Sequence, residues 1–461
     1  MGSRKQEPSE TKKIKQDISP AFSRRNFLRR TSIGAGALAI ASCSPFQSNV
    51  GTNPDDQVQL VYQDWRTDWF PSLAKRMLEV FSETHPNIHV FFTPDPENLT
   101  EQMELDFRNG SAPDVLAGCC DFLPQWAQQG YLLDLRPFID ADLNQILIDD
   151  WDSAQYNALA LSNGQQFGLP KYHGSLALYY NKDLFDRNEV EYPDHSWNIG
   201  DYSSAMEIFY KAALSPGKRP FWGSMLDISW ERLQVHANGR GGHFVNPLDD
   251  TKSLMGSEET LAAMEWIRSE MWEKQHLAVP RDVGNLSTRD AFSMGMLAMV
   301  EDGSWALKDI LEKSDFRIGV APFPSGPDRK VTLATTDGFA IYAGTRYPEA
   351  AWELLKFLVS LDYGKELARA HLLQPARASL QEEWIDIVRR QYLEKTREMD
   401  IAAFTEGHLQ GYSVTAEIFR NMAEARKLAK GAFQKIFTFG TADVQILREV
   451  SQDIEKSQQG S

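Results

Sequence analysis

The chain has 461 residues with a formal net charge of −16, and its length exceeds the roughly 250–300 residues at which one hydrophobic core stops growing, so we expect two lobes. The first 42 residues hold nine Lys and Arg against three Asp and Glu, a contribution of +6, so the remainder carries −22. A remainder this acidic argues against nucleic acid or anionic lipid as a partner.

The start of the chain has the pattern of an export leader. Residues 23–29 read SRRNFLR, residues 31–42 are small and apolar, and residues 40–43 read Ile-Ala-Ser-Cys. This order is typical of a twin-arginine signal, with its pair at Arg24 and Arg25, that runs into a lipobox. The apolar run is shorter than the ~20 residues that span a bilayer. We expect residues 1–42 to be removed and Cys43 to carry a lipid, which would leave an extracytoplasmic protein, periplasmic or cell-surface, held to the membrane only by that lipid. The competing interpretation is a chance arginine pair.

After a polar tether at 43–57, strands and helices alternate. Strands are expected at 58–65, 88–92 and 114–119, and helices from Pro71 and over 98–109, where Gly110 follows. This alternation indicates a parallel sheet covered by helices, and hence an α/β fold. Cys119 and Cys120 follow the third strand, and we interpret them as small buried residues rather than as metal ligands.

Further along, an apolar run ends at Tyr180, and helices are expected over 257–275 and after Pro348. The segment 408–457 is expected to form helices joined near Gly431 and Gly440.

Eight short stretches resemble one known family. In chain order they are SAPDVLAG (111–118), WAQQGYLLDL (126–135), FGLPKYHGSLALYYNKDLF (167–185), NGRGGHFVN (238–246), FSMGMLAMVEDGSWAL (292–307), RIGVAPFPSG (317–326), TTDGFAIYAGTRYPEAAWELLKFL (335–358) and QPAR (374–377). Each is loose, but their order and spacing resemble the extracellular solute-binding proteins of ATP-driven importers, in the carbohydrate-binding group that includes the maltose-binding protein.

The resemblance implies a two-lobed periplasmic-binding-protein fold, type II-like, with discontinuous lobes joined by a hinge and the ligand between them. Carried over by position, the chain crosses between lobes near 176–181, 316–320 and 360–370. The lobes would then be 58–178 with 318–365, and 179–317 with 366–457.

Polar and aromatic residues that follow strands are candidates for binding a sugar. Sugar hydroxyls need Asp, Asn, Glu and Arg, and sugar C–H faces need Trp and Tyr. In α/β proteins such sites lie at the carboxyl ends of the strands. Asp64 and Trp65 end the first strand and Asp121 follows the third, although each could instead pack the lobe or cap a helix.

The resemblance adds further candidates. It implies an acidic ligand contact at Asp121 and stacking surfaces at Trp230 and Trp305. Residues near these or on neighbouring loops complete the expected ligand site, each with packing, capping or hinge support as the alternative: Tyr172, His173, Gly242, Asp302, Asp337, Phe339 and Arg377.

The sequence therefore predicts the lipid-anchored binding subunit of an ABC transporter, which captures a sugar or oligosaccharide without a cofactor, as a monomer, and docks on permease subunits. A non-sugar solute (a glycerol phosphodiester, polyol or polyamine) is the alternative ligand, and a receptor-reporting binding protein would look the same. A secreted glycan hydrolase needs a pair of carboxylates, which any acidic chain offers, but no GxSxG or HExxH motif occurs. We expect no enzymatic activity.

Overall fold

The computed structural model describes residues 57–119, 121–214 and 221–459. Arg24, Arg25, Cys43 and Cys120, and with them the predicted leader and most of the tether, lie outside these ranges. Among the described residues, no helix combines the length and the apolar character needed to cross a membrane.

The first sheet joins strands that are far apart in the sequence, in the order β2-β1-β3-β11-β4. They are β1 (Val58–Asp64), β2 (Ile88–Pro94), β3 (Val115–Gly118), β4 (Leu169–Pro170) and β11 (Gly338–Ile341). β1 pairs in parallel with β2 and β3, whereas β11 runs antiparallel to β3 and β4. The predicted alternation of strands and helices over residues 58–119 is confirmed.

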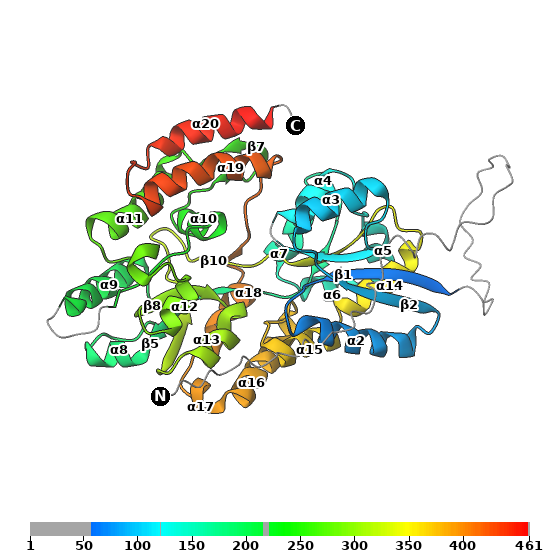
Figure 1. Cartoon of the computed structure of the whole chain (residues 1–461), viewed down its shortest axis with the longest axis horizontal. Helices are drawn as coiled ribbons and strands as arrows, with labels where there is room; N and C mark the ends of the chain where they lie inside the picture. The colour runs from blue at the N-terminus through cyan, green and yellow to red at the C-terminus, as the bar shows by residue number, and fades with distance from the viewer. Residues whose placement is uncertain (1–56, 120, 215–220, 460–461) are drawn as a thin grey trace, which may run out of the picture. The chain divides into compact units, whose positions relative to one another are not determined.

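Helices cover both faces of this sheet (Figure 1). Along β3, Val115 and Ala117 join one core and Leu116 joins the other, as the two-residue period of a strand requires. The first face packs against α2 (Phe70–Thr84), α5 (Arg136–Asp142), α14 (Pro348–Leu358) and α15 (Leu361–His371). The second packs against α3 (Leu99–Asn109) and α4 (Phe122–Gln128), and the short helices α6 (Gln145–Asp149) and α7 (Ser153–Ala158) follow in the chain.

The second sheet has β5 (Leu176–Asn181) between β8 (Met299–Gly303) and β9 (Ile318–Pro322), and both pairings are antiparallel. All six residues of β5 are buried, because its two faces belong to two different cores. One core gathers α9 (Ile199–Ala213), α10 (Trp230–Gly239), α11 (Glu258–Arg268), α19 (Met422–Phe433) and α20 (Ile446–Gln458). The other gathers α12 (Thr288–Ser293), α13 (Leu307–Lys313) and α16 (Gln381–Gln391).

Shorter elements complete the described chain. They are α8 (Lys182–Arg187), α17 (Leu393–Thr396), α18 (Glu406–Gln410), the hairpin of β6 (Val245–Asn246) and β7 (Asp249–Ser253), and the parallel pair of β10 (Thr332–Leu333) and β12 (Ser413–Val414). Single 3-10 turns are formed by Pro280–Val283, Ser304–Ala306, Ala378–Leu380 and Ile401–Phe404, and π turns extend α11 and α19 over Ser269–Glu273 and Gln434–Thr438.

The chain passes between the two sheets along three segments that hydrogen-bond to one another. The His173 backbone N–H donates to the Gln374 carbonyl at 2.8 Å, and the Thr335 N–H donates to the Gly174 carbonyl at 2.8 Å. The Gln155 Nε2 of α7 donates to the carbonyls of Tyr172 and Thr335. The segments that were predicted as crossings, 176–181 and 316–320, instead lie in the second sheet as β5 and most of β9, so the expected lobe boundaries at 178 and 318 cut through that sheet.

Of the two junctions predicted in the last fifty residues, the one near Gly440 is confirmed, because Gly440 lies with φ +62° between Gln434–Thr438 and α20, and the one near Gly431 is wrong. Gly431 lies inside α19, and residues 411–421 run in an extended path that contains β12. The physical reason is that residues 413–421 pair and pack across the second core instead of forming their own helical hydrogen bonds. α19 and α20 then lie side by side over β7 (Figure 1).

Candidate ligand-binding site

The described chain has a cavity of about 860 Å³. One side is lined by α3, α4 and residues 158–163, which belong with the first sheet. The other side is lined by Asp250 of β7, residues 415–421 and the first turn of α19, which belong with the second. The volume lies within the usual range for a small-molecule site.

Uncharged hydrogen-bonding side chains dominate the polar lining of this cavity. They are Gln125, Gln128, Gln129, Ser162, Asn163, Thr336, Thr415 and Asn421. The charged residues of the lining have partners, because Asp250 pairs with Arg420 at 3.0 Å and Glu104 pairs with Arg108 at 3.4 Å. The cavity therefore offers many donors and acceptors and little uncompensated charge.

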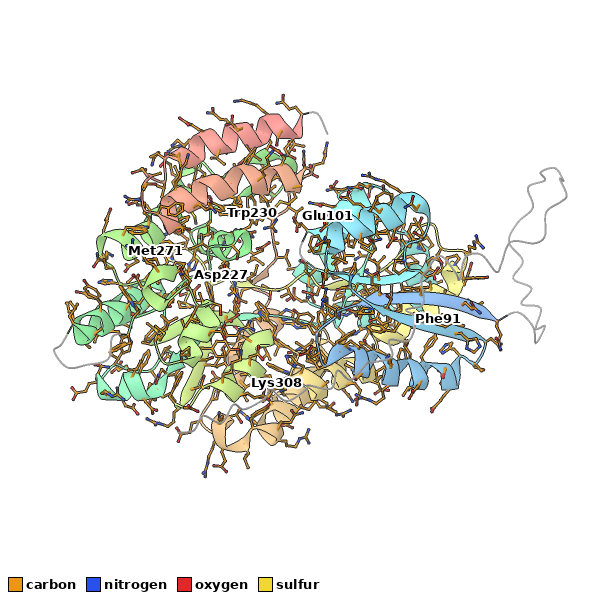
Figure 2. The ribbon with its side chains drawn as sticks, viewed as in Figure 1. Phe91, Glu101, Asp227, Trp230, Met271 and Lys308 are labelled. Carbon is orange, nitrogen blue, oxygen red and sulfur yellow. The ribbon has the colours of Figure 1, made fainter. Side chains whose placement is uncertain are left out.

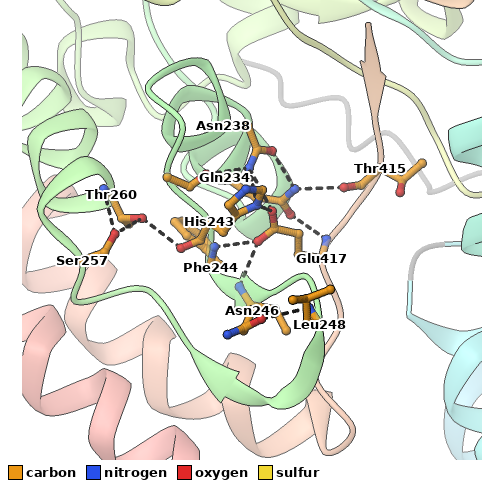
Figure 3. Close-up of polar contacts among 12 residues, drawn as sticks. Gln234, Asn238, His243, Phe244, Asn246, Leu248, Ser257, Thr260, Thr415 and Glu417 are labelled. Carbon is orange, nitrogen blue, oxygen red and sulfur yellow. Dashed lines mark hydrogen bonds and ion pairs between the residues drawn. The ribbon is translucent and has the colours of Figure 1, made fainter. Parts of the chain in front are cut away.

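The wall at residues 415–421 is fixed by the carboxylate of Glu417 (Figure 3). Glu417 Oε2 accepts hydrogen bonds from the backbone N–H groups of Phe244 at 2.6 Å and Val245 at 2.9 Å. Its Oε1 accepts from Asn238 Nδ2 at 2.9 Å and lies 2.6 Å from His243 Nδ1. The side chain of Gln234 also holds this extended segment, because it donates to the Thr415 carbonyl at 2.9 Å and accepts from the Glu417 backbone N–H at 2.7 Å.

Four of the predicted ligand residues gather around Lys171, a residue that the sequence analysis did not select. The Lys171 ammonium forms a buried ion pair with Asp64 and lies 3.1 Å from the centroid of the Trp65 ring. The Trp65 ring meets that of Tyr172 edge to face at 5.5 Å. Burial and the nearby Asp64 charge raise the pKa of Asp337 to about 7, against an ordinary value of 3.8. The Lys171 ammonium therefore already binds the Asp64 carboxylate and covers one face of the Trp65 ring.

Asp121 and Trp230 meet through another residue that was not selected, Arg426 of α19. The Arg426 Nε donates to Asp121 Oδ2 at 2.9 Å, and its Nη2 pairs with Glu231. Its guanidinium lies 5.9 Å from the Trp230 ring. Trp230 lies between α10 and α19 (Figure 2) and is only 3% exposed, so its ring packs in the core instead of opening to the cavity.

Asp302 and Trp305 are linked in the same manner by Arg232. Asp302 accepts from Arg232 Nη2 at 3.1 Å and from Arg289 Nε at 2.9 Å, so both of its oxygens have partners. The Arg232 guanidinium lies 5.3 Å from the Trp305 ring centroid. Trp305 is partly exposed and packs against Gly174 of the first crossing segment.

The remaining predicted residues have structural roles in this arrangement. Phe339 was expected in a loop, but it lies within β11 and is fully buried. His173 is buried and stacks on His408 at 4.7 Å. Arg377 stacks on Trp151 at 3.7 Å and donates to two first-lobe carbonyls, and its burial lowers its pKa to about 10. Gly242 packs against Thr260 at the start of α11.

The twelve predicted ligand residues thus lie outside the lining of the large cavity. The residues that do line it are Gln, Asn, Ser and Thr on helix ends and an extended segment, and nothing in the sequence distinguishes them from other surface polar residues. Lys171 did carry a signal, because a lysine directly after a buried strand usually has a buried partner.

Comparison with known proteins reveals relatives over most of the chain. It is 25% identical to the maltodextrin-binding protein of Bacillus subtilis over 335 residues, which cover 70% of this chain and 73% of that protein. It is 25% identical to a maltooligosaccharide ABC transporter solute-binding lipoprotein of Streptococcus pneumoniae over 283 residues, 60% of this chain and 62% of that protein.

Solved structures share the fold. An ABC substrate-binding protein from Listeria monocytogenes in complex with cycloalternan superposes with a TM-score of 0.73 at 22% identity, over 87% of this chain and 99% of that chain. The maltose/maltodextrin-binding domain from Bdellovibrio bacteriovorus bound to maltotriose gives a TM-score of 0.65 at 18% identity, with 87% and 99% covered. These likenesses confirm the predicted α/β periplasmic-binding-protein fold.

The family itself is shown by the sequence. The family of bacterial extracellular solute-binding proteins matches residues 63–365, which is more than half of the chain. The predicted resemblance is confirmed, and membership makes the protein a binding protein rather than an enzyme. The chain therefore belongs to the family of bacterial extracellular solute-binding proteins.

Proposed function

We propose that this protein is the sugar-binding subunit of an ABC importer and that it captures a neutral oligosaccharide in the cavity of about 860 Å³. The observation that carries the proposal is the character of the lining, whose polar groups are mostly uncharged and whose charged residues have partners. Hydroxyl groups need many donors and acceptors, whereas a charged ligand needs an unpaired opposite charge. The carbohydrates named for the relatives support the same class.

Capture proceeds by closure of two lobes about the crossing segments. The lobes correspond to the two sheets with their helices, so that β5 and β9 belong to one lobe. A ligand that contacts both walls of the cavity binds the closed state more tightly and shifts the population toward it. The closed monomer then docks on the permease subunits, and no cofactor takes part.

Closure also offers a role for the partly exposed indoles. Trp65 and Trp305 both lie against the first crossing segment, in contact with Tyr172 and Gly174 respectively. They supply flat apolar surface to the sugar rings as the lobes move. We propose that the other predicted ligand residues also contact the sugar in this closed state.

The predicted leader determines the proposed localisation of the protein. After twin-arginine export and removal of residues 1–42, the lipid on Cys43 holds the binding domain at the outer side of a membrane, periplasmic or at the cell surface. One relative is named a lipoprotein, which supports the anchor.

Thermal unfolding of the full chain against a panel of ligands tests the proposal. A ligand at 100 times its dissociation constant stabilises by about 2.7 kcal/mol, which is a readable rise in melting temperature. The panel holds mono- and oligosaccharides, polyols, glycerol phosphodiesters and polyamines. We expect a shift with a neutral oligosaccharide that is reduced in Gln125→Ala and Gln128→Ala, both in the cavity.

The matched control is Gln145→Ala, which removes an exposed helical glutamine that is not part of the cavity. It should keep the full shift. A shift only with a phosphodiester, polyol or polyamine would assign the protein to another ligand class, and consumption of a glycan would contradict the binding function.

A further inference from the structure

Arg426 joins the two walls beside the cavity. Its guanidinium bonds to Asp121 at 2.9 Å, and Asp121 immediately precedes α4, which packs with the first sheet. The same guanidinium pairs with Glu231 of α10, which packs with the second core, as does α19 itself. One cation thus bridges two carboxylates that belong to different sheets.

The bridge lies next to the cavity, not in it. α4 presents Pro124 and Gln125 to the cavity, and α19 presents Met422 and Ala423. One turn further along α19, Arg426 lines a separate groove of about 380 Å³ together with Trp230. A ligand can therefore fill the cavity while the ion pair remains intact.

The surroundings favour a strong ion pair. The side chain of Asp121 is 11% exposed and that of Arg426 is 30% exposed, so solvent and salt screen this pair less than a surface pair. Two carboxylates compensate the guanidinium, which also lies over the Trp230 ring at 5.9 Å.

We propose that Arg426 is a latch that holds the α4 and α19 walls together in the ligand-free protein and so preorganises the cavity. When the binding-competent arrangement is already populated without ligand, less binding free energy is spent on the conformational change, and the affinity is higher. The effect of the latch on affinity rests on the proposed function, whereas its effect on the ligand-free protein does not.

The first test is small-angle X-ray scattering of the purified full chain without ligand. We expect Arg426→Ala to have a larger radius of gyration than the wild type. Lys427→Ala is the matched control, because Lys427 is the next residue of α19 and pairs with Glu424 at the surface. Circular dichroism checks that both variants are folded. A radius of gyration in Arg426→Ala equal to those of the wild type and Lys427→Ala would overturn the latch.

The second test compares Asp121→Asn, Arg426→Ala and the double variant. If the two side chains act through their bond, the double variant has the radius of gyration of either single variant instead of the sum of both changes. Additive changes would mean that the two residues act independently and would contradict the proposal.

The third test is titration calorimetry with the sugar identified by the thermal panel. We expect Arg426→Ala to bind about tenfold more weakly, since a preorganising contact is lost, and Lys427→Ala to bind as the wild type does. Tighter binding by Arg426→Ala would show that the bridge competes with ligand and would overturn preorganisation. If no sugar binds even the wild type, the proposed function fails while the scattering result still decides the latch.

Discussion

Lys171 Nζ lies 3.1 Å from the centre of the Trp65 ring, and the same ammonium forms an ion pair with Asp64 in which both side chains are fully buried. The ring of Phe70 flanks it at 4.6 Å. The protein thus places its own cation on the aromatic surface at the end of β1. A sugar that stacks on Trp65 has to use the other face of the indole.

The first prediction concerns this buried pair. Lys171→Met leaves Asp64 without its counter-charge, and breaking a buried pair in this way costs about 3–5 kcal/mol of unfolding free energy. Lys171→Met combined with Asp64→Asn should recover much of that loss, because no unpaired charge is left. Urea denaturation measures both effects.

Lys75→Met serves as the control, since Lys75 is exposed on α2. It should change the unfolding free energy by less than about 0.5 kcal/mol. If Lys171→Met lowers the unfolding free energy no more than this control does, the Lys171–Asp64 ion pair does not stabilise the fold.

The second prediction concerns pH. Burial raises the pKa of Asp337 to about 7, and burial also raises that of Asp95 to about 6. A carboxyl with a raised folded-state pKa contributes stability that is full below the ordinary value near 3.8 and is lost as the pH rises through the folded value. The wild type should therefore lose stability between pH 4 and pH 8, on the order of 4 kcal/mol from Asp337 alone.

Asp337→Asn should flatten this part of the profile, because an amide resembles the protonated carboxyl and does not titrate. Denaturant melts at a series of pH values give the comparison, with the exposed Asp328→Asn as the control. If the slope of unfolding free energy against pH is unchanged in Asp337→Asn, another group is responsible for the loss of stability.

The third prediction concerns Glu417. In Glu417→Gln only one of the two terminal atoms can still accept, so either the backbone N–H groups of Phe244 and Val245 or Asn238 Nδ2 lose an acceptor. The expected cost is about 1–3 kcal/mol. Because the wall at 415–421 is released, hydrogen exchange should also rise in that segment. Glu424→Gln, at a surface ion pair on α19, should leave both measurements unchanged.

The fourth prediction distinguishes packing from ligand contact at Gly242. A Cβ there would lie 2.7 Å from Thr260 Oγ1 and 2.8 Å from the Thr260 backbone nitrogen. Gly242→Ala should lower the unfolding free energy by about 1–3 kcal/mol and leave ligand affinity, measured by calorimetry at a temperature where the variant is folded, unchanged.

Gly431 provides the opposite case. It lies inside α19 with open space around its Cα, so Gly431→Ala should stabilise the protein by about 0.5–1 kcal/mol. If Gly242→Ala instead binds the ligand more weakly, Gly242 contacts the ligand and is not only a packing residue.

The sequence predicts the first three strands of the first sheet well because each is a complete local pattern, but it misses that β11 joins them antiparallel. The runs at 58–65, 88–92 and 114–119 are apolar, bounded by polar or turn residues and separated by helical periods, so their type follows from the chain alone. The segments that cross between the two sheets are harder to predict from the sequence. The runs in β5 and β9 are buried on both faces, and such a run does not reveal which sheet it joins.

The site could be predicted less well for a different reason. Trp230 and Trp305 look alike in the sequence, yet one is 3% exposed in a core and the other is partly open. Their exposure depends on α19 and on the first crossing segment, which are distant in the chain. Similarly, Asp121 follows β3 as expected whereas Asp302 lies inside β8, and arginines from other helices already bind both carboxylates.

The position of β11 has a consequence for biosynthesis. The first sheet places Gly338–Ile341 between β3 and β4, so it remains incomplete until residue 341 has left the ribosome. Until then β3 has an open edge, which invites pairing with other chains. The half-made lobe therefore exposes an unpaired strand edge during synthesis, and a route that carries finished proteins across a membrane would spare it a second such exposure outside the cell.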